Sequence, residues 1–123
     1  ELAHMIEGGA DLFLMPSRFE PCGLNQMYSL RYGTVPVVRA TGGLDDTVEQ
    51  VDERTGEGTG FKFEPYTSDA MLGELRRALR WFARPAAWRR IQLAGMRQDN
   101  SWDASARAYV EVYARARAAA AAR

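Results

Sequence analysis

The residues best suited to chemistry in this chain lie between Pro16 and Gln26, in the segment Pro-Ser-Arg-Phe-Glu-Pro-Cys-Gly-Leu-Asn-Gln. An apolar run precedes this segment, and an amphipathic stretch that ends near Gly33 follows it. This order predicts a strand, a loop and a helix. A helix N-terminus presents unpaired backbone N–H groups and a positive dipole end, so it suits a phosphate. Ligands of open parallel sheets bind at such strand-to-helix crossings. We therefore expect binding of a nucleotide or a sugar phosphate.

Glu20 is kept out of the predicted helix by the proline that follows it, because a residue before proline favours extended geometry. Its carboxylate is expected at the rim of the sheet, where it either accepts hydrogen bonds from sugar hydroxyls or balances the helix dipole. Gly23, with Leu24 and Asn25 behind it, either offers free N–H groups to an anion or forms an ordinary helix start. The pattern alone leaves both pairs of alternatives open.

Two further features have a chemical and a structural interpretation. Cys22 stands at the same helix terminus, which can activate a thiol toward alkylating agents; we favour the alternative, a small packing residue. Gly42 and Gly43 repeat the strand-to-helix arrangement, and glycine lets a backbone approach a ligand closely. Any tight turn of this kind can use the same pair. The glycines of residues 56–60 lack a preceding strand and a following helix, so they form no dinucleotide fingerprint.

The composition is that of one ordinary globular domain, with 123 residues, 46% of them hydrophobic and 26% charged. The single cysteine excludes an internal disulfide framework, and with the single histidine it argues against a Cys/His metal site. Residues 1–61 contain four basic and ten acidic side chains, whereas residues 62–123 contain twelve and six. The basic half is either a nucleic-acid surface or, as we favour, a set of solvated helix faces.

Targeting signals are not apparent in the chain. It has no apolar stretch near 18 residues and no signal-like segment, so we expect a soluble, cytoplasmic protein without membrane contact. The chain starts at Glu1 on a segment that already resembles a helix, and residues 114–123 are only alanine and arginine. We expect it to be the rear part of a longer protein.

The pattern of apolar residues predicts an α/β fold. Helices are expected over residues 1–7, 23–32 and 44–51, strands over 11–15, 35–39 and 61–63, and three helices after residue 68. Strands separated by helices imply a short parallel sheet of about three strands with right-handed crossovers.

Several residues are expected to fix the boundaries and faces of these elements. Gly8-Gly9 is expected to cap the first helix, and Pro36 to open its strand or lie at an edge. Ser101 is expected to cap the last helix. The tryptophans and tyrosines fall on apolar stripes and are expected in the core. One such stripe, in the helix after residue 68, contains Leu72, Leu75, Leu79 and Phe82.

Five blocks of this sequence resemble bacterial glycogen synthase, a family related to the starch synthases. They are residues 16–26, Tyr-Gly-Thr-Val-Pro-Val-Val (32–38), Thr-Gly-Gly-Leu-Asp-Asp-Thr-Val (41–48), Gly-Thr-Gly-Phe (58–61), and the set Ser101, Trp102, Asp103, Tyr109 and Tyr113. The resemblance runs in register over residues 1–115, which we take as a partial C-terminal glycosyltransferase domain. Residues 116–123 form an Ala/Arg-rich tail.

The resemblance implies a retaining α-1,4-glucosyltransferase that uses ADP-glucose and has two Rossmann-like domains, of which this chain is the rear part of the second. Glu20 matches the catalytic glutamate that contacts the donor glucose. The residues that match the donor sugar and diphosphate loops are Cys22, Gly23, Leu24, Asn25, Gly42 and Gly43. Asn25 stands where relatives often have Thr, and Tyr28 where a broader group has a second glutamate. The family implies no metal and no cofactor.

The resemblance also predicts that this chain alone is inactive, because the family's diphosphate-neutralising residues and acceptor-facing domain precede it. The partners implied are ADP-glucose and an α-1,4-glucan such as glycogen, with no nucleic acid. Two alternatives remain: a nucleotide-sugar transferase of the same fold with a UDP or GDP donor, and a non-catalytic module that binds nucleotide, glucan or a partner protein. A three-stranded sheet would leave the strand of residues 11–15 with a bare edge, a site for self-association.

Overall fold

Three short apolar runs form one parallel sheet in the computed structural model, which describes residues 1–121. The strands are β1 (Leu12–Met15), β2 (Val35–Arg39) and β3 (Phe61–Phe63), and they lie in the order β1-β2-β3. Leu12 pairs with Val35, and Val37 pairs with Phe61. A helix lies between consecutive strands, as parallel pairing requires a crossover connection. The predicted α/β class and the short parallel sheet are confirmed.

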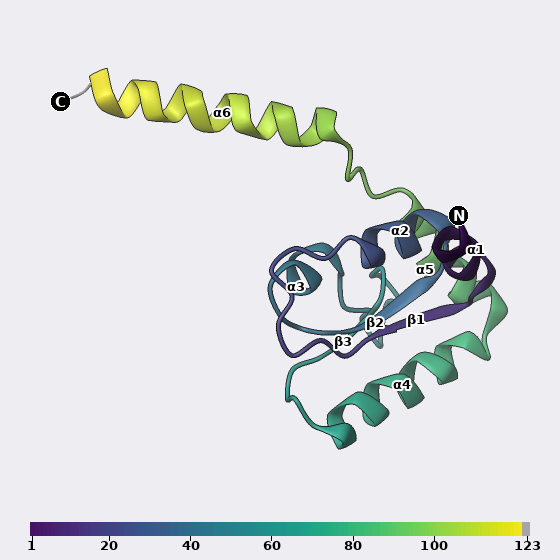
Figure 1. The fold of residues 1–123 in the computed structure, drawn as a ribbon. Helices are drawn as coiled ribbons and strands as arrows, with labels where there is room; N and C mark the ends of the chain where they lie inside the picture. The colour runs from purple at the N-terminus through teal and green to yellow at the C-terminus, as the bar shows by residue number, and fades with distance from the viewer. Residues whose placement is uncertain (122–123) are drawn as a thin grey trace.

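Helices cover both faces of this sheet (Figure 1). They are α1 (Leu2–Gly9), α2 (Asn25–Tyr32), α3 (Gly43–Thr47), α4 (Ser68–Phe82), α5 (Pro85–Met96) and α6 (Trp102–Ala121). Figure 1 shows α4 on one side of the strands and α2 and α3 on the other. α5 contacts both α2 and α4, so it closes one end of the layers.

The core lies on both faces of β2, which is buried almost throughout. Val35 and Val37 belong to a cluster with Phe61 on the side of α4 and α5, whose other buried members are Val51, Ala78, Trp81, Trp88 and Ile91. Val38 points to the opposite face and packs with Leu44 and Val48. Alternate residues of a strand point to opposite faces, so a central strand covered on both sides is apolar at every position.

Pro36 does not open a strand or lie at an edge, and that prediction is wrong. It is the second residue of β2, the central strand. The Ala40 N–H donates to the Phe63 carbonyl, so even-numbered residues of β2 turn their amides toward β3. β3 pairs with β2 only from Val37 onward. The hydrogen bonds between β2 and β3 therefore begin after Pro36. The N–H group that proline lacks would have had no partner at this position.

The prediction of a helix over residues 44–51 is wrong for the second half of this range. α3 ends at Thr47, and Val48 is extended. The Val51 N–H donates to the Gly60 carbonyl at 2.9 Å, which holds this segment beside the start of β3. Val48 and Val51 are both buried. β-branched residues fit extended backbone well, and here the pairing with a distant segment outweighs the local helical pattern.

The end of α1 also differs from the prediction of a glycine cap. Gly8 and Gly9 are both helical, and the helix stops at Ala10, which is extended. The hydroxyl of Thr34, the residue directly before β2, contacts the carbonyl oxygens of Glu7 and Ala10. A side chain from a neighbouring segment thus satisfies the last carbonyls of α1, a task that a glycine cap would otherwise perform.

The predicted start of α2 is wrong and its predicted end is confirmed. Gly23 lies ahead of the helix, which begins at Asn25 with Leu24 as its N-cap residue. Gly33 ends the helix with φ 80°, and its N–H donates to carbonyls of the last turn. Only glycine adopts this left-handed conformation readily, so the predicted stop is confirmed.

The apolar stripe of α4 is buried only in part, through Leu75, which packs against the core cluster. Leu72, Leu79 and Phe82 are exposed, whereas Ala78 and Trp81 are buried against the sheet and α5. Among the other aromatic residues Trp88 is also buried. The expectation that all tryptophans and tyrosines are core residues is wrong for Trp102, which is 88% exposed, and for all five tyrosines, which are exposed as well: Tyr28, Tyr32, Tyr66, Tyr109 and Tyr113.

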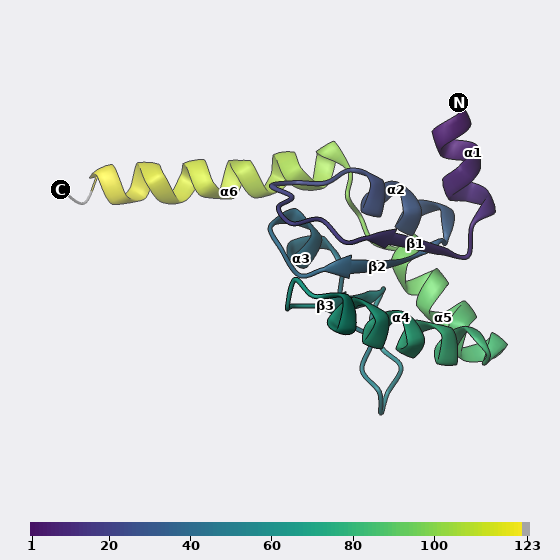
Figure 2. The ribbon, with the colours of Figure 1, turned by 60° about the horizontal axis from the view of Figure 1, so that its bottom comes forward.

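α6 projects away from the sheet and its covering helices (Figures 1 and 2). None of its residues up to Ala121 is buried. Its start is fixed locally, because the Ala104 N–H donates to the Ser101 hydroxyl at 3.2 Å, and this confirms the predicted cap. The helix continues without interruption across the boundary predicted at residues 115 and 116. Residues 122–123 of the tail lie outside the described residues.

Arg77 of α4 ties this helix to the loop of residues 52–59, which projects below β3 in Figure 2. Its guanidinium donates to the Glu53 and Glu74 carboxylates at 2.5 and 2.7 Å and to the Val51 carbonyl, and lies 5.4 Å from the Phe61 ring centre. Burial lowers the pKa of Arg77, but the two carboxylates outweigh it and raise that pKa overall. The hydrogen bond from Arg77 lowers the pKa of Glu53.

Arg77→Met keeps an apolar stem against Phe61 but removes these hydrogen bonds. We expect the free energy of unfolding at pH 7 to fall by about 2 kcal/mol, measured by urea titration. The pKa of Glu53 is lowered from its ordinary value of 4.5 in the folded state. The contribution of Glu53 to the free energy of unfolding is therefore complete above pH 4.5 and is lost as the pH falls below that value. The difference between wild type and variant should therefore shrink in acid. Arg76→Met, at an exposed neighbour, is the control; an equal loss there would contradict the assignment.

Candidate functional site

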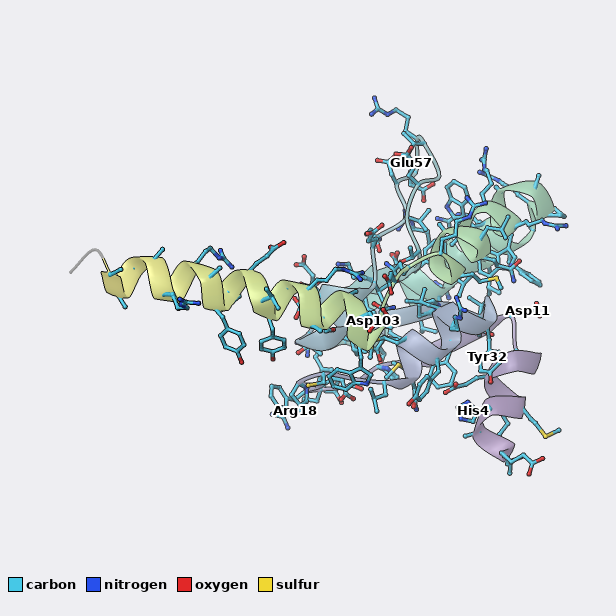
Figure 3. All side chains as sticks on the ribbon, turned by 90° about the horizontal axis from the view of Figure 1, so that it is seen from above. His4, Asp11, Arg18, Tyr32, Glu57 and Asp103 are labelled. Carbon is cyan, nitrogen blue, oxygen red and sulfur yellow. The ribbon has the colours of Figure 1, made fainter. Side chains whose placement is uncertain are left out.

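The predicted site residues lie at the carboxyl edge of the sheet, on the loops that follow β1 and β2. Figure 3 labels Asp11 and Arg18 at opposite ends of β1, with Arg18 on the loop that leads to Glu20. Glu20 is partly buried and Cys22 is exposed. The loop after β2 contains Gly42, which is the N-cap residue of α3. The fold thus brings the two predicted loops to one edge, as expected for parallel strands.

A backbone contact joins these two loops directly. The Gly43 N–H donates to the carbonyls of Glu20 and Pro21, at 3.1 and 3.2 Å. A Cβ atom on Gly43 would overlap the Cys22 carbonyl, and one on Gly42 would overlap the Glu20 carbonyl. Both glycines are therefore required for the close approach of one loop to the other. We refer to this contact between residues 20–22 and 42–43 as the loop clasp.

Gln26 supports the loop clasp from below and was not among the predicted site residues. Its side-chain Nε2 donates to the carbonyls of Cys22 and Gly23 and to the Thr47 hydroxyl, each at 3.1 Å. The side chain is fully buried. The sequence held one signal for this role: a polar residue in the first turn of α2, three positions after Gly23. Position 23 needs a glycine, because a Cβ atom there would collide with the Gln26 amide.

The N-terminus of α2 lacks a protein side chain that caps it. Leu24 is the N-cap residue and makes no side-chain hydrogen bond, and the first turn contains no acidic residue. Gly23 precedes it with φ 69°, a conformation that favours glycine. The free N–H groups of the first turn thus face the same edge as Glu20, where they can bind an anion.

Several charged residues of β2, β3 and α3 are engaged with groups of neighbouring segments. Asp45, in the first turn of α3, forms an ion pair with Lys62 at 2.6 Å. Arg39, the last residue of β2, donates to the carbonyl of Arg18 at 2.7 Å. The Arg18 side chain itself is exposed. Within residues 1–121 no group of three metal-ligating side chains occurs.

A groove of about 790 Å³ lies beside this site, between α2 and the segment that joins α5 to α6. Leu24, Met27 and Tyr28 line the groove on the side of α2, and Trp102 lines it on the side of α6. Glu20, Cys22 and Gly23 are not among the residues that line it. Leu24 is a predicted donor-site residue that also lines the groove, so the groove adjoins the open edge of the sheet where the other predicted site residues lie.

Comparison with protein families gives a match over residues 1–90 to the family described as glycosyl transferases group 1. The matched region includes the whole sheet and both loops of the clasp. This chain belongs to that family. The predicted resemblance to glycogen synthase is likewise confirmed by individual relatives.

Three curated relatives are proteins named glycogen synthase. The one from Koribacter versatilis is 59% identical over 116 residues, which is 94% of this chain and 24% of that protein. The relative from Anaeromyxobacter sp. (strain K) is 64% identical over 112 residues, covering 91% and 23%. The relative from Thermotoga petrophila is 55% identical over 117 residues, covering 94% and 24%. The chain thus spans about a quarter of the length of these relatives.

Two solved structures have the same fold over almost the whole chain. The catalytic domain of starch synthase IV from Arabidopsis thaliana, bound to ADP and acarbose, matches with a TM-score of 0.83 and 40% identity, over 93% of this chain and 24% of that one. Sucrose-phosphate synthase from Thermosynechococcus elongatus matches with a TM-score of 0.63 and 28% identity, over 92% and 27%. The chain therefore has the fold of part of a glycosyltransferase catalytic domain.

No helix within residues 1–121 is long and apolar enough to span a membrane.

Gly43→Ala should break the loop clasp, because the added methyl group overlaps the Cys22 carbonyl. We expect the free energy of unfolding to fall by about 3 kcal/mol and the amide signals of residues 20–23 to shift. Gly73→Ala is the matched control, since nothing lies within 4 Å of a Cβ atom there and the position is helical. That substitution should stabilise the chain by about 0.5 to 1 kcal/mol. Equal stability of both variants would show that the clasp does not need glycine.

Proposed function

We propose that this chain is the rear part of the second Rossmann-like domain of an enzyme that transfers glucose from ADP-glucose to the non-reducing end of an α-1,4-glucan, with retention. The observation behind the proposal is that Glu20 lies beside the uncapped N-terminus of α2 and is held there by the loop clasp. The glycogen synthase relatives and the starch synthase structure bound to ADP and acarbose support this donor and acceptor class. A cytoplasmic location stays a prediction.

In this proposal the loops after β1 and β2 divide the donor between them. Glu20 contacts the donor glucose and stabilises the positive charge that develops as the glycosidic bond breaks. The N–H groups at Gly23, Leu24 and Asn25 face the diphosphate, since a helix N-terminus stabilises an anion. Cys22, Gly42 and Gly43 form the adjoining wall of the site. Charge stabilisation of this kind is usually the largest single contribution to catalysis.

We further propose that the chain alone does not transfer glucose. At the edge of the sheet that it contributes, Arg39 and Lys62 are engaged with other groups of the chain, in hydrogen bonds and an ion pair. Arg18, whose side chain is exposed, adds one positive charge there, so neutralisation of the leaving diphosphate would depend in part on residues outside this chain. In the sheet of the described residues β1 has one free edge. We propose that this edge pairs with further strands in a longer protein and allows association of the isolated chain, which sedimentation at increasing concentration would detect.

Titration of the isotope-labelled chain with ADP, ADP-glucose and UDP tests the donor site directly. We expect backbone amide shifts confined to residues 20–27 and 41–45, larger for ADP than for UDP. The physical reason is that the N–H groups of the α2 N-terminus bind the diphosphate. Larger shifts with UDP would favour a transferase with another donor, for which the sucrose-phosphate synthase likeness is the supporting observation. Shifts elsewhere, without any at these loops, would place the nucleotide outside the proposed site.

Glu20→Gln tests the catalytic role in an active context. Residues 1–115 of this chain would replace the matching segment of the glycogen synthase from Koribacter versatilis, and the chimera would be assayed for glucan extension. We expect the substitution to lower kcat on the order of 100- to 1000-fold, because it removes the charge that stabilises the transition state.

Glu57→Gln is the control, since Figure 3 places Glu57 at the tip of the projecting loop, away from Arg18 and the loop that leads to Glu20. Equal activity of the Glu20→Gln and Glu57→Gln chimeras would rule out the proposed role of Glu20. An inactive wild-type chimera that binds ADP would instead favour a non-catalytic binding module.

A further inference from the structure

Arg39 connects the loops that follow all three strands. It is the last residue of β2 and is partly buried. Its guanidinium donates to the carbonyl of Arg18, beyond β1, at 2.7 Å and to the carbonyl of Glu64, beyond β3, at 3.2 Å. The guanidinium carbon lies 5.4 Å from the centre of the Tyr66 ring. One side chain of the central strand thus joins both neighbouring loops at the edge that contains Glu20.

The loop segment between β1 and Glu20 depends on this contact. Within residues 1–121 the only hydrogen bond to the backbone of residues 16–19 is the one that Arg39 donates to Arg18. The next backbone contact along the loop is the clasp, where the Glu20 carbonyl accepts from Gly43. The two contacts lie two residues apart, on either side of the Glu20 backbone. Together they fix the position from which the Glu20 carboxylate projects.

The geometry requires arginine rather than a generic cation. The two hydrogen bonds leave from different nitrogens of one planar group, Nη1 toward Arg18 and Nε toward Glu64. A lysine ammonium is a single point on a flexible stem, so it cannot hold both carbonyls at these separate positions. The Tyr66 ring lies over the guanidinium and limits the plane in which it can rotate.

We propose that Arg39 is a positioning residue that sets the place of the Glu20 carboxylate by fixing the loop of residues 16–19 against the loop after β3. The proposal rests on the proposed function of Glu20 and adds a residue that does not itself contact the donor. Displacement of a catalytic group by about 1 Å lowers rates on the order of a hundredfold. Because Arg39 acts through a group that works in the transition state, its loss should lower kcat and leave KM for the donor unchanged.

The first experiment measures the loop itself in the 123-residue chain and needs no activity. Arg39→Lys and Arg39→Ala should shift the amide signals of residues 17–20 and 64–66 while the remaining signals stay in place. Arg84→Ala is the matched control, because the Arg84 guanidinium lies at the same 5.4 Å from a ring, that of Trp81, at the start of α5. Unchanged loop signals in both Arg39 variants would overturn the proposal. Unfolding of Arg39→Lys would do so too, since Arg39 would then maintain overall stability instead.

The second experiment uses the active chimera defined above. Arg39→Ala should lower kcat on the order of a hundredfold and Arg39→Lys about tenfold, each with KM for the donor unchanged. In the Glu20→Gln background the effect of Arg39→Ala should nearly vanish, because a residue that acts only through Glu20 has nothing left to position. A full effect of Arg39→Ala in that background would overturn the proposal. An inactive wild-type chimera, or a Glu20→Gln variant of normal activity, would count against the proposed function alone, and the loop signals would then decide the role of Arg39.

Discussion

The loop clasp, in which the Gly43 N–H lies between the carbonyls of Glu20 and Pro21, is the contact on which the site depends. Two backbones can approach this closely only where neither has a Cβ atom in the way, and this explains the pair Gly42-Gly43. The clasp sets the separation between the loops after β1 and β2. It thereby sets where the N-termini of α2 and α3 lie relative to each other.

Side chains reinforce the clasp from two directions. Gln26 lies beneath it and binds carbonyls of residues 22 and 23 together with the Thr47 hydroxyl of α3. Arg39 lies at the end of the central strand and holds the loop two residues before Glu20. Arg39 uses two nitrogens of one side chain for carbonyls of different segments, whereas Gln26 uses one amide nitrogen for two carbonyls of its own loop and a hydroxyl of α3. A loop held in this way keeps a carboxylate in place without a helix or strand around it, as a preorganised site requires.

Several large apolar side chains of the described residues are exposed. The outer stripe of α4 with Leu72, Leu79 and Phe82, the aromatic residues of α6 and the free edge of β1 are all exposed. Exposed surfaces of this kind mark contacts with other protein segments. They agree with the proposal that the chain works as one part of a longer enzyme, about a quarter of which is similar to this sequence in the known relatives.

The order of strands and helices, the parallel sheet, the stop at Gly33 and the cap at Ser101 could all be predicted from the sequence, because each follows from local periodicity or from the conformation of one residue. It also indicated the loops of Glu20 and of Gly42-Gly43. The folded chain was needed to show that Pro36 lies in the central strand, that α3 ends at Thr47, and that Gln26 and Arg39 bind the loops. These features depend on contacts between segments that are distant in the chain, such as Gln26 with Thr47 and Arg39 with Arg18, and local patterns do not contain them.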